Sequence, residues 1–249
     1  MKINRMLVSV LLAVLLIGAL VGKFVLTERF GVADQVRQTA PATVHIGNVE
    51  QGCQGSGVVI AADGIVLTAK HVVEDGKNFV VTLNDGTELH SSNVCISKNY
   101  DAAFIKVDCN EPLAVASVGS LEDVRLGEAV YAIGSPFGSD NFNSITMGIL
   151  SARQRDLMEN HYGWRVTFQT DAPGLNPGNS GGPIFNMAGE VVGIVVAGPA
   201  RSNVGVTYCV PVDVFAGDLD MVRMMLAMNA YKIQEAPQPD YGQMYERRR

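Results

Sequence analysis

The chain has 249 residues, enough for one large domain or two small lobes. Its formal net charge is −6 and no basic face is visible, so the sequence gives no reason to expect a nucleic-acid partner. Glycine is frequent, with 26 residues, and only 18% of residues are charged, which is typical of a β-rich fold with many tight turns. The 4 histidines and 4 cysteines form no cluster and no CxxC pair, so a metal site is not expected.

The N-terminus carries a targeting segment. Lys2 and Arg5 precede Met6–Gly22, an uncharged run of 17 residues. This run is short for a membrane-spanning helix and long for a signal-peptide core. We therefore expect residues 1–23 to be an uncleaved signal anchor, with a cleaved signal peptide as the alternative. Basic residues before the span predict a cytoplasmic N-terminus and an external remainder.

Residues 24–40 read as a linker with a short helix that ends before Pro41, because the residue before proline disfavours helical geometry. In residues 41–112, short apolar runs alternate with Gly- and Asn-containing turns, which predicts a β-barrel or sandwich. The expected strands are Thr43–Gly47, Gly55–Ile60, Ile65–Ala69, Phe79–Leu83, Val94–Ser97 and Ala102–Val107.

Residues 113–217 are expected to form a second β lobe, entered through the polar and irregular stretch Glu111–Gly127. No strand alternates with a long helical pattern, which disfavours an α/β fold and favours the all-β class. The expected strands are Ala129–Ile133, Ser144–Ala152, Trp164–Gln169, Ile184–Asn186, Glu190–Ala197 and Val204–Val210.

The end of the chain changes character. Residues 218–231 have apolar positions at helical spacing and predict an amphipathic helix, and residues 232–249 predict a disordered tail. Among the cysteines, Cys95 and Cys109 are equidistant from Ala102, so a hairpin turning there could place them face to face. This leaves two alternatives of equal weight, a disulfide if the compartment is oxidising and buried free thiols.

The stretch Asn176–Pro183, Asn-Pro-Gly-Asn-Ser-Gly-Gly-Pro, places one serine among three glycines. Glycine lets successive backbone N–H groups point into one small concavity beside the Ser180 hydroxyl. Such a concavity suits a developing oxyanion next to a nucleophile. A tight turn between strands is the alternative, because these residue types are also ordinary turn residues.

A serine hydroxyl needs a base to become a nucleophile. His71 stands where the apolar run ending at Thr68 passes into a polar loop, and Asp101 opens the apolar strand Ala102–Val107. A carboxylate in that position needs a hydrogen-bond donor, and an imidazole N–H would provide one while fixing the useful tautomer. A structural histidine and a turn cap are the alternatives, but the ordered set favours base, orienting acid and nucleophile.

These segments resemble the trypsin-like (chymotrypsin-fold) serine proteases, and within them the HtrA/Deg group. The resemblance covers roughly residues 36–228. Its motifs are Gly55–Ile60 with Thr68–Val73 for the histidine region, Asp101–Val107 for the aspartate strand, Ala132–Gly138 with Thr146–Ala152 for the activation-loop region, and Gln169–Ala172 with Asn176–Pro183 for the serine region.

The resemblance implies two six-stranded antiparallel β-barrels with the cleft between them, followed by the C-terminal helix. It implies that His71 is the general base, Asp101 its orienting acid and Ser180 the nucleophile. The backbone N–H groups of Gly178 and Ser180 would form the oxyanion hole, and peptide cleavage would pass through an acyl-enzyme. No metal or organic cofactor is needed for this chemistry.

The substrate pocket is expected from Gly174 and Leu175 and from the strand end Val196, Ala197 and Gly198. Because no acid is present there, a small or medium aliphatic side chain is a better fit than Arg or Lys. Val196 stands where many relatives carry a hydroxyl that helps to hold the catalytic aspartate, so either Asp101 finds other donors or the triad is weaker. The run from Asp171 to Ser180 is one residue longer than is usual in the group.

The sequence thus predicts a membrane-anchored serine endopeptidase with its catalytic domain in the periplasm or at the cell surface. Its partners would be polypeptide substrates, either unfolded or membrane-associated, in quality control or envelope protein processing. The resemblance also implies a possible homotrimer, and the few residues after the helix predict no PDZ domain. The alternatives are a latent enzyme whose loops 138–143 and 172–175 order on ligand binding, and an inactive protease-fold chaperone.

Overall fold

The computed structural model describes residues 31–157, 164–173, 176–197, 205–215 and 222. The expected signal anchor, the C-terminal tail, and the expected helix 218–231 except Val222 lie outside the described residues. Among the residues that are described, no helix is long and apolar enough to cross a membrane. The chain divides into residues 1–35 and 36–249. Helix α2 is Val32–Thr39 and is followed by a 3-10 turn, η1, at Ala40–Ala42.

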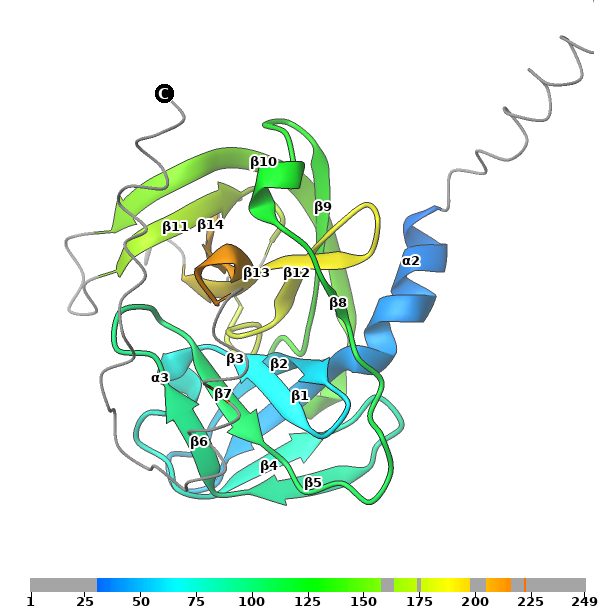
Figure 1. Cartoon of the computed structure of the whole chain (residues 1–249), viewed down its shortest axis with the longest axis vertical. Coiled ribbons are helices and arrows are strands. Elements are labelled where there is room, and N and C mark those ends of the chain that lie inside the picture. Colours follow the sequence, from blue (N-terminus) through cyan, green and yellow to red (C-terminus); the bar gives the residue numbers. More distant parts are fainter. Residues whose placement is uncertain (1–30, 158–163, 174–175, 198–204, 216–221, 223–249) are drawn as a thin grey trace, which may run out of the picture. The chain divides into compact units, whose positions relative to one another are not determined.

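The first half of the larger unit is a β-sheet of seven strands in the order β5-β4-β1-β2-β3-β7-β6 (Figure 1). A short helix, α3, at Lys70–Val73 follows β3. The strands are β1 Thr43–Asn48, β2 Cys53–Ala61, β3 Ile65–Thr68, β4 Phe79–Thr82, β5 Glu88–Ser91, β6 Asn93–Ile96 and β7 Ala103–Lys106.

The prediction of six strands in this lobe is wrong by one, because β5 was missed. Its residues alternate between exposed and half-buried, so no apolar run marks it. Only Ser92 separates β5 from β6, and one bent stretch of chain therefore pairs with β4 on one side and with β7 on the other. The Ser91 hydroxyl donates to the Lys106 carbonyl at 2.6 Å at this bend. The bend brings the two edges of the sheet together, as a barrel requires.

The second half contains another seven strands in the order β12-β9-β10-β11-β14-β13-β8 (Figure 1). Three 3-10 turns accompany them: η2 Leu121–Asp123, η3 Ser139–Asn141 and η4 Val212–Phe215. The strands are β8 Ser117–Val118, β9 Ala129–Gly134, β10 Ser144–Leu157, β11 Trp164–Thr170, β12 Pro183–Asn186, β13 Glu190–Ala197 and β14 Thr207–Pro211.

This second sheet closes because β12 pairs with β13 as well as with β9. The closed ring contains the strands that the sequence predicted. The additional strand, β8, is two residues long and pairs in parallel with the edge of β13. It lies in the stretch that was expected to be irregular, and two residues are too few to show an alternating pattern. The prediction of an all-β fold with two barrels is confirmed, but each described sheet has seven strands and the second is not purely antiparallel.

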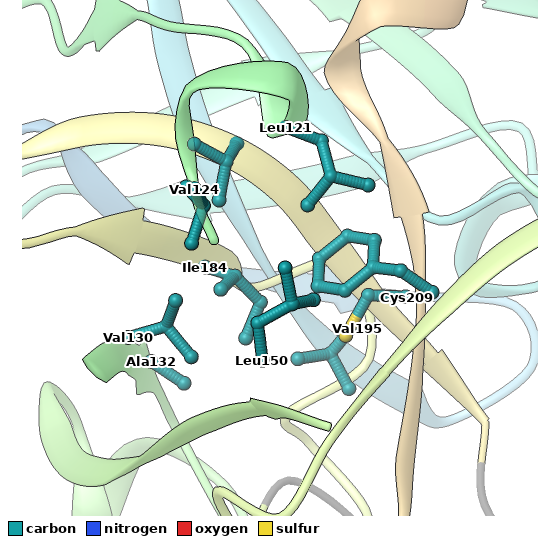
Figure 2. Close-up of a cluster of buried hydrophobic side chains, with 10 residues drawn as sticks. Leu121, Val124, Val130, Ala132, Leu150, Ile184, Val195 and Cys209 are labelled. Carbon is teal, nitrogen blue, oxygen red and sulfur yellow. The ribbon is translucent and has the colours of Figure 1, made fainter. Parts of the chain in front are cut away.

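The interior of the second barrel is filled by apolar side chains, mostly aliphatic, from its strands and from the η2 segment, which point toward one another (Figure 2). On β9, Val130 and Ala132 face this cluster. Tyr131, between them, is fully buried on the other face, where its ring stacks on Phe185 at 5.1 Å. Because β9 is buried on both faces, it is a firm base for the loop that follows it at Gly134.

All four cysteines are free. Of the two alternatives for Cys95 and Cys109, the structure has the free thiols, because the β6–β7 hairpin places Cys95 opposite Phe104. The chain therefore turns earlier than Ala102, and Cys109 comes after the end of β7. Burial raises the pKa of the Cys95 thiol, and that of Cys209 more strongly.

Candidate active site

His71 is positioned by the end of β3. The four residues of β3 are fully buried, the chain stays extended at Ala69, and α3 begins at Lys70. Val72 and Val73 are buried and anchor this short helix. His71 is left with a side chain that is 27% exposed, so its ring is held by the fold but still reaches solvent.

Asp101 is brought to His71 by strand pairing. β7 runs antiparallel to β3, with Ala103 opposite Thr68, so Asp101, two residues before β7, lies beside the residues that follow β3. The Asp101 side chain is fully buried. His71 donates its backbone N–H to Oδ1 at 2.9 Å, and its ring Nδ1 lies 2.6 Å from Oδ2.

An ionised carboxylate can only accept hydrogen bonds, so the proton between the two side chains belongs to Nδ1. The His71 ring then presents the lone pair of Nε2 to the solvent side, which is the tautomer that a general base requires. The backbone N–H of His71 is the other donor that the sequence required for Asp101. Val196, at the predicted hydroxyl position, is buried in β13 and offers no hydroxyl.

The loop that carries Ser180 packs directly against the end of β3. A Cβ added to Gly181 would lie 2.2 Å from Thr68 Oγ1 and 2.7 Å from the Ala69 nitrogen, so only glycine fits there. The Ser56 N–H donates to the Ser180 carbonyl at 2.7 Å. Ser180 and His71 are thus held on adjoining segments. No hydrogen bond joins their side chains within the described part of the chain, and such bonds often tighten only when substrate binds.

Two peptide groups of this loop have a fixed orientation. The Pro177 carbonyl accepts the Phe137 N–H at 2.6 Å, and the Asn179 carbonyl accepts the Gly182 N–H at 2.9 Å. In a trans peptide the N–H points opposite to the C=O, so the N–H groups of Gly178 and Ser180 point away from the donors Phe137 and Gly182. Neither N–H has an acceptor among the described residues. They are free to bind an oxyanion.

Ser56 on β2 also supports this loop, and sequence reasoning gave it no role of its own. Its side chain is fully buried, donates to the Gly178 carbonyl at 2.7 Å and accepts the Ser135 N–H at 3.0 Å. It therefore ties β2 to the loop after β9 and to the serine loop. The only sequence signal is a hydroxyl between two glycines, directly before the apolar run Val58–Ala61.

A cavity of about 30 Å³ is lined by the serine loop at Asn176 and Asn179, by the end of β9, and by Ser144 and Thr146. Its volume suits an ordered water molecule rather than a substrate side chain. Val196, the one expected substrate-pocket residue whose side chain is described, does not line it. Of the other expected residues, Gly174, Leu175 and Gly198 lie outside the described part of the chain, as does the side chain of Ala197.

Comparison with known proteins agrees with this geometry. The profile of the trypsin-like peptidase domain matches residues 55–194, a range that contains His71, Asp101 and Ser180. This chain belongs to the trypsin-like peptidase family. No group of three or more His, Cys, Asp or Glu side chains that could hold a metal ion occurs among its described residues.

Within the family, the chain is similar to proteins of the HtrA/Deg group, as the sequence motifs predicted. The "Probable periplasmic serine endoprotease DegP-like" of Halomonas elongata is 42% identical over 199 residues, which are 79% of this chain and 40% of that protein. The protein of the same name from Pseudomonas fluorescens is 45% identical over 163 residues, which are 64% of this chain and 33% of that protein. The chain thus spans less than half the length of these relatives.

A solved structure is also similar. It is described as "HtrA-type protease AlgW with tripeptide", and it superposes with a TM-score of 0.69 at 30% sequence identity. The match covers 77% of this chain and 64% of that one. The trypsin-like peptidase fold of this chain is therefore supported by sequence and by three-dimensional similarity.

Proposed function

We propose that this chain is a serine endopeptidase that cleaves polypeptides through an acyl-enzyme. Ser180 Oγ attacks the scissile carbonyl while His71 Nε2 takes its proton, and His71 later returns that proton to the leaving amine. Asp101 holds the imidazole, and the N–H groups of Gly178 and Ser180 bind the oxyanion. The observation that carries the proposal is the double hydrogen bond from His71 to Asp101, at 2.9 and 2.6 Å.

The orientation of the serine loop favours an active enzyme over a latent one. If the 177–178 peptide were turned around, its carbonyl would point toward the oxyanion site and the Gly178 N–H would be lost as a donor. The hydrogen bond from the Phe137 N–H to the Pro177 carbonyl opposes that rotation. Ser56 adds a second restraint through the Gly178 carbonyl.

The cellular setting is inferred from the relatives and from the N-terminal segment. The curated relatives are named as periplasmic proteins, which supports a catalytic domain outside the cytoplasm. We propose that Met6–Gly22 anchors the chain in the membrane and that its substrates are unfolded or membrane-associated polypeptides. We also propose that the enzyme prefers a small or medium aliphatic residue before the scissile bond. We further propose that the chain forms a homotrimer, which light scattering would detect.

A fluorophosphonate probe tests the chemistry directly, because it labels only a serine that is activated as a nucleophile. We expect the wild type and Ser117→Ala, which lacks an exposed serine on β8, to be labelled at the same rate. Ser180→Ala should show no labelling and no casein turnover. Absence of labelling in a folded wild-type protein would overturn the proposal, and labelling that requires an added peptide would favour the latent alternative.

A further inference from the structure

Phe137 has an unusual backbone conformation that its side chain does not explain. Its φ is +60°, and Asn143 is the only other described residue besides glycine with positive φ. Asparagine visits this region readily, whereas a bulky side chain there crowds its own carbonyl. The Phe137 side chain is 64% exposed, so packing in the interior does not compensate for the crowding. Glycine would take this conformation without strain.

The hydrogen bond that holds Phe137 is made by its backbone, and its ring forms no aromatic pair with another described residue. Its N–H donates to the Pro177 carbonyl at 2.6 Å, and a glycine would donate equally well. The fold therefore accounts for the backbone but not for the aromatic ring. Strained backbone that persists beside a reactive centre commonly has a functional reason.

The position of Phe137 suggests that reason. The nitrogen of Phe137 lies 3.2 Å from where a Cβ on Gly178 would be, next to one donor of the proposed oxyanion hole. The next residue, Gly138, packs on the side chain of Gln54 at the start of β2. Phe137 thus contacts the part of the serine loop that precedes Ser180 in the sequence. β13 contacts the part that follows Ser180, through hydrogen bonds of Val195 with Gly181 and Gly182.

The scissile carbonyl of a bound polypeptide must lie beside Ser180, between Phe137 and β13. The substrate residues before the scissile bond would lie along β13, whose end was expected to line the substrate pocket. The part after the scissile bond must then leave toward the opposite end of the loop, where the exposed residue Phe137 lies. A rigid aromatic ring with few rotatable bonds is well suited to covering an apolar side chain.

We propose that Phe137 is a substrate-binding residue that contacts apolar side chains on the leaving-group side of the scissile bond. This inference rests on the proposed endopeptidase function. It names a specificity determinant for the residues that depart with the amine, in addition to the pocket expected for the residue before the bond.

The test uses quenched fluorescent peptides built on a cleavage site mapped in β-casein. The peptides are identical up to the scissile bond and carry either Leu or Ser at each of the next two positions. The measured quantity is the ratio of kcat/KM for the Leu and Ser peptides within each variant, so a general change in catalysis cancels. We expect Phe137→Gly to reduce this ratio roughly 5- to 20-fold, as loss of one buried apolar contact implies, and Phe137→Leu to recover most of it.

Leu126→Gly is the matched control, because Leu126 is exposed to a similar degree, at 61%, and lies outside the site. Its ratio should equal that of the wild type. A second measurement lets the acyl-enzyme partition between water and added leucinamide or glycinamide, and Phe137→Gly should lose the preference for leucinamide. An unchanged ratio in Phe137→Gly, or an effect confined to residues before the scissile bond, overturns the inference. Failure of the proposed function is recognised separately, as absence of fluorophosphonate labelling in the wild type.

Discussion

At the scale of single residues, the geometry of the site is fixed by the hydrogen bonds that Asp101 accepts. Both carboxylate oxygens of Asp101 are used by His71, one by the backbone and one by the ring. This fixes the position of the helix start and the rotation of the imidazole together. A hydroxyl on β13 is then not required to hold the acid, which explains how Val196 can stand at that position.

Gly178 gives the sharpest prediction at this scale. Its φ is +100°, and an added Cβ would lie 2.2 Å from the Ser135 carbonyl oxygen, a backbone atom with little freedom to move. We expect Gly178→Ala to displace the oxyanion donor and lower kcat by about 10²- to 10³-fold. Gly86→Ala is the control, because its φ is +86° but nothing lies within 4 Å of the added Cβ. Equal kcat for Gly178→Ala and the wild type would remove this N–H from the mechanism.

At the scale of elements, the sequence predicted the strands with apolar runs and the order of the site residues. His71, Asp101 and Ser180 could be singled out because each stands where an apolar run meets a turn or a glycine cluster. Ser56 and Phe137 could not be singled out, since their roles depend on contacts between β2 and two loops that are distant in sequence. β5 was missed for another reason: its residues alternate between exposed and half-buried, so no apolar run marks it, and it is defined by its pairing with β4.

Ser56 links β2 to the two loops of the site, and the loss of this link should be measurable. Its buried hydroxyl joins β2 to the Gly178 carbonyl and to the Ser135 N–H. Ser56→Ala leaves both partners without this hydroxyl, so we expect a loss of about 1–3 kcal/mol of stability and slower fluorophosphonate labelling. Urea unfolding and labelling kinetics measure the two effects, with Ser117→Ala as the exposed control. Slower labelling without any loss of stability would contradict a structural link.

Glu50 joins the turn after β1 to the residues before β4 and gives a pH prediction. The N–H groups of Lys77 and Asn78 donate to its carboxylate and lower its pKa from 4.5 to about 2. A lowered folded-state pKa means that Glu50 stabilises the fold above pH 4.5 and loses this effect as the pH falls toward 2. We expect Glu50→Gln to be less stable than the wild type near neutral pH and equal to it at the acid end. A stability difference that grows on acidification would reverse this sign.

At the scale of the whole molecule, the site exists only where the two barrels meet. His71 and Asp101 come from the first barrel and Ser180 from the second. Residue Ser56 bonds across this junction to Gly178, Ser180 and Ser135. Because these bonds hold the serine loop, opening either barrel should destroy the site. The barrels are therefore expected to unfold as one cooperative unit.

The cysteines provide an internal measurement of that cooperativity. Cys95 is buried in the first barrel and Cys209 in the second, and burial raises the pKa of both thiols, so neither should react with a thiol reagent in the native protein. Cys53 is exposed and should react at once, and reductant should leave the thermal midpoint unchanged because no disulfide is present among the four. In increasing urea, we expect Cys95 and Cys209 to become reactive together, at the concentration where fluorophosphonate labelling is lost. Modification of Cys95 at a lower urea concentration than Cys209 would show that the first barrel opens alone. If fluorophosphonate labelling persisted after Cys95 had been modified, the hydrogen bonds of Ser56 would not be what holds the site.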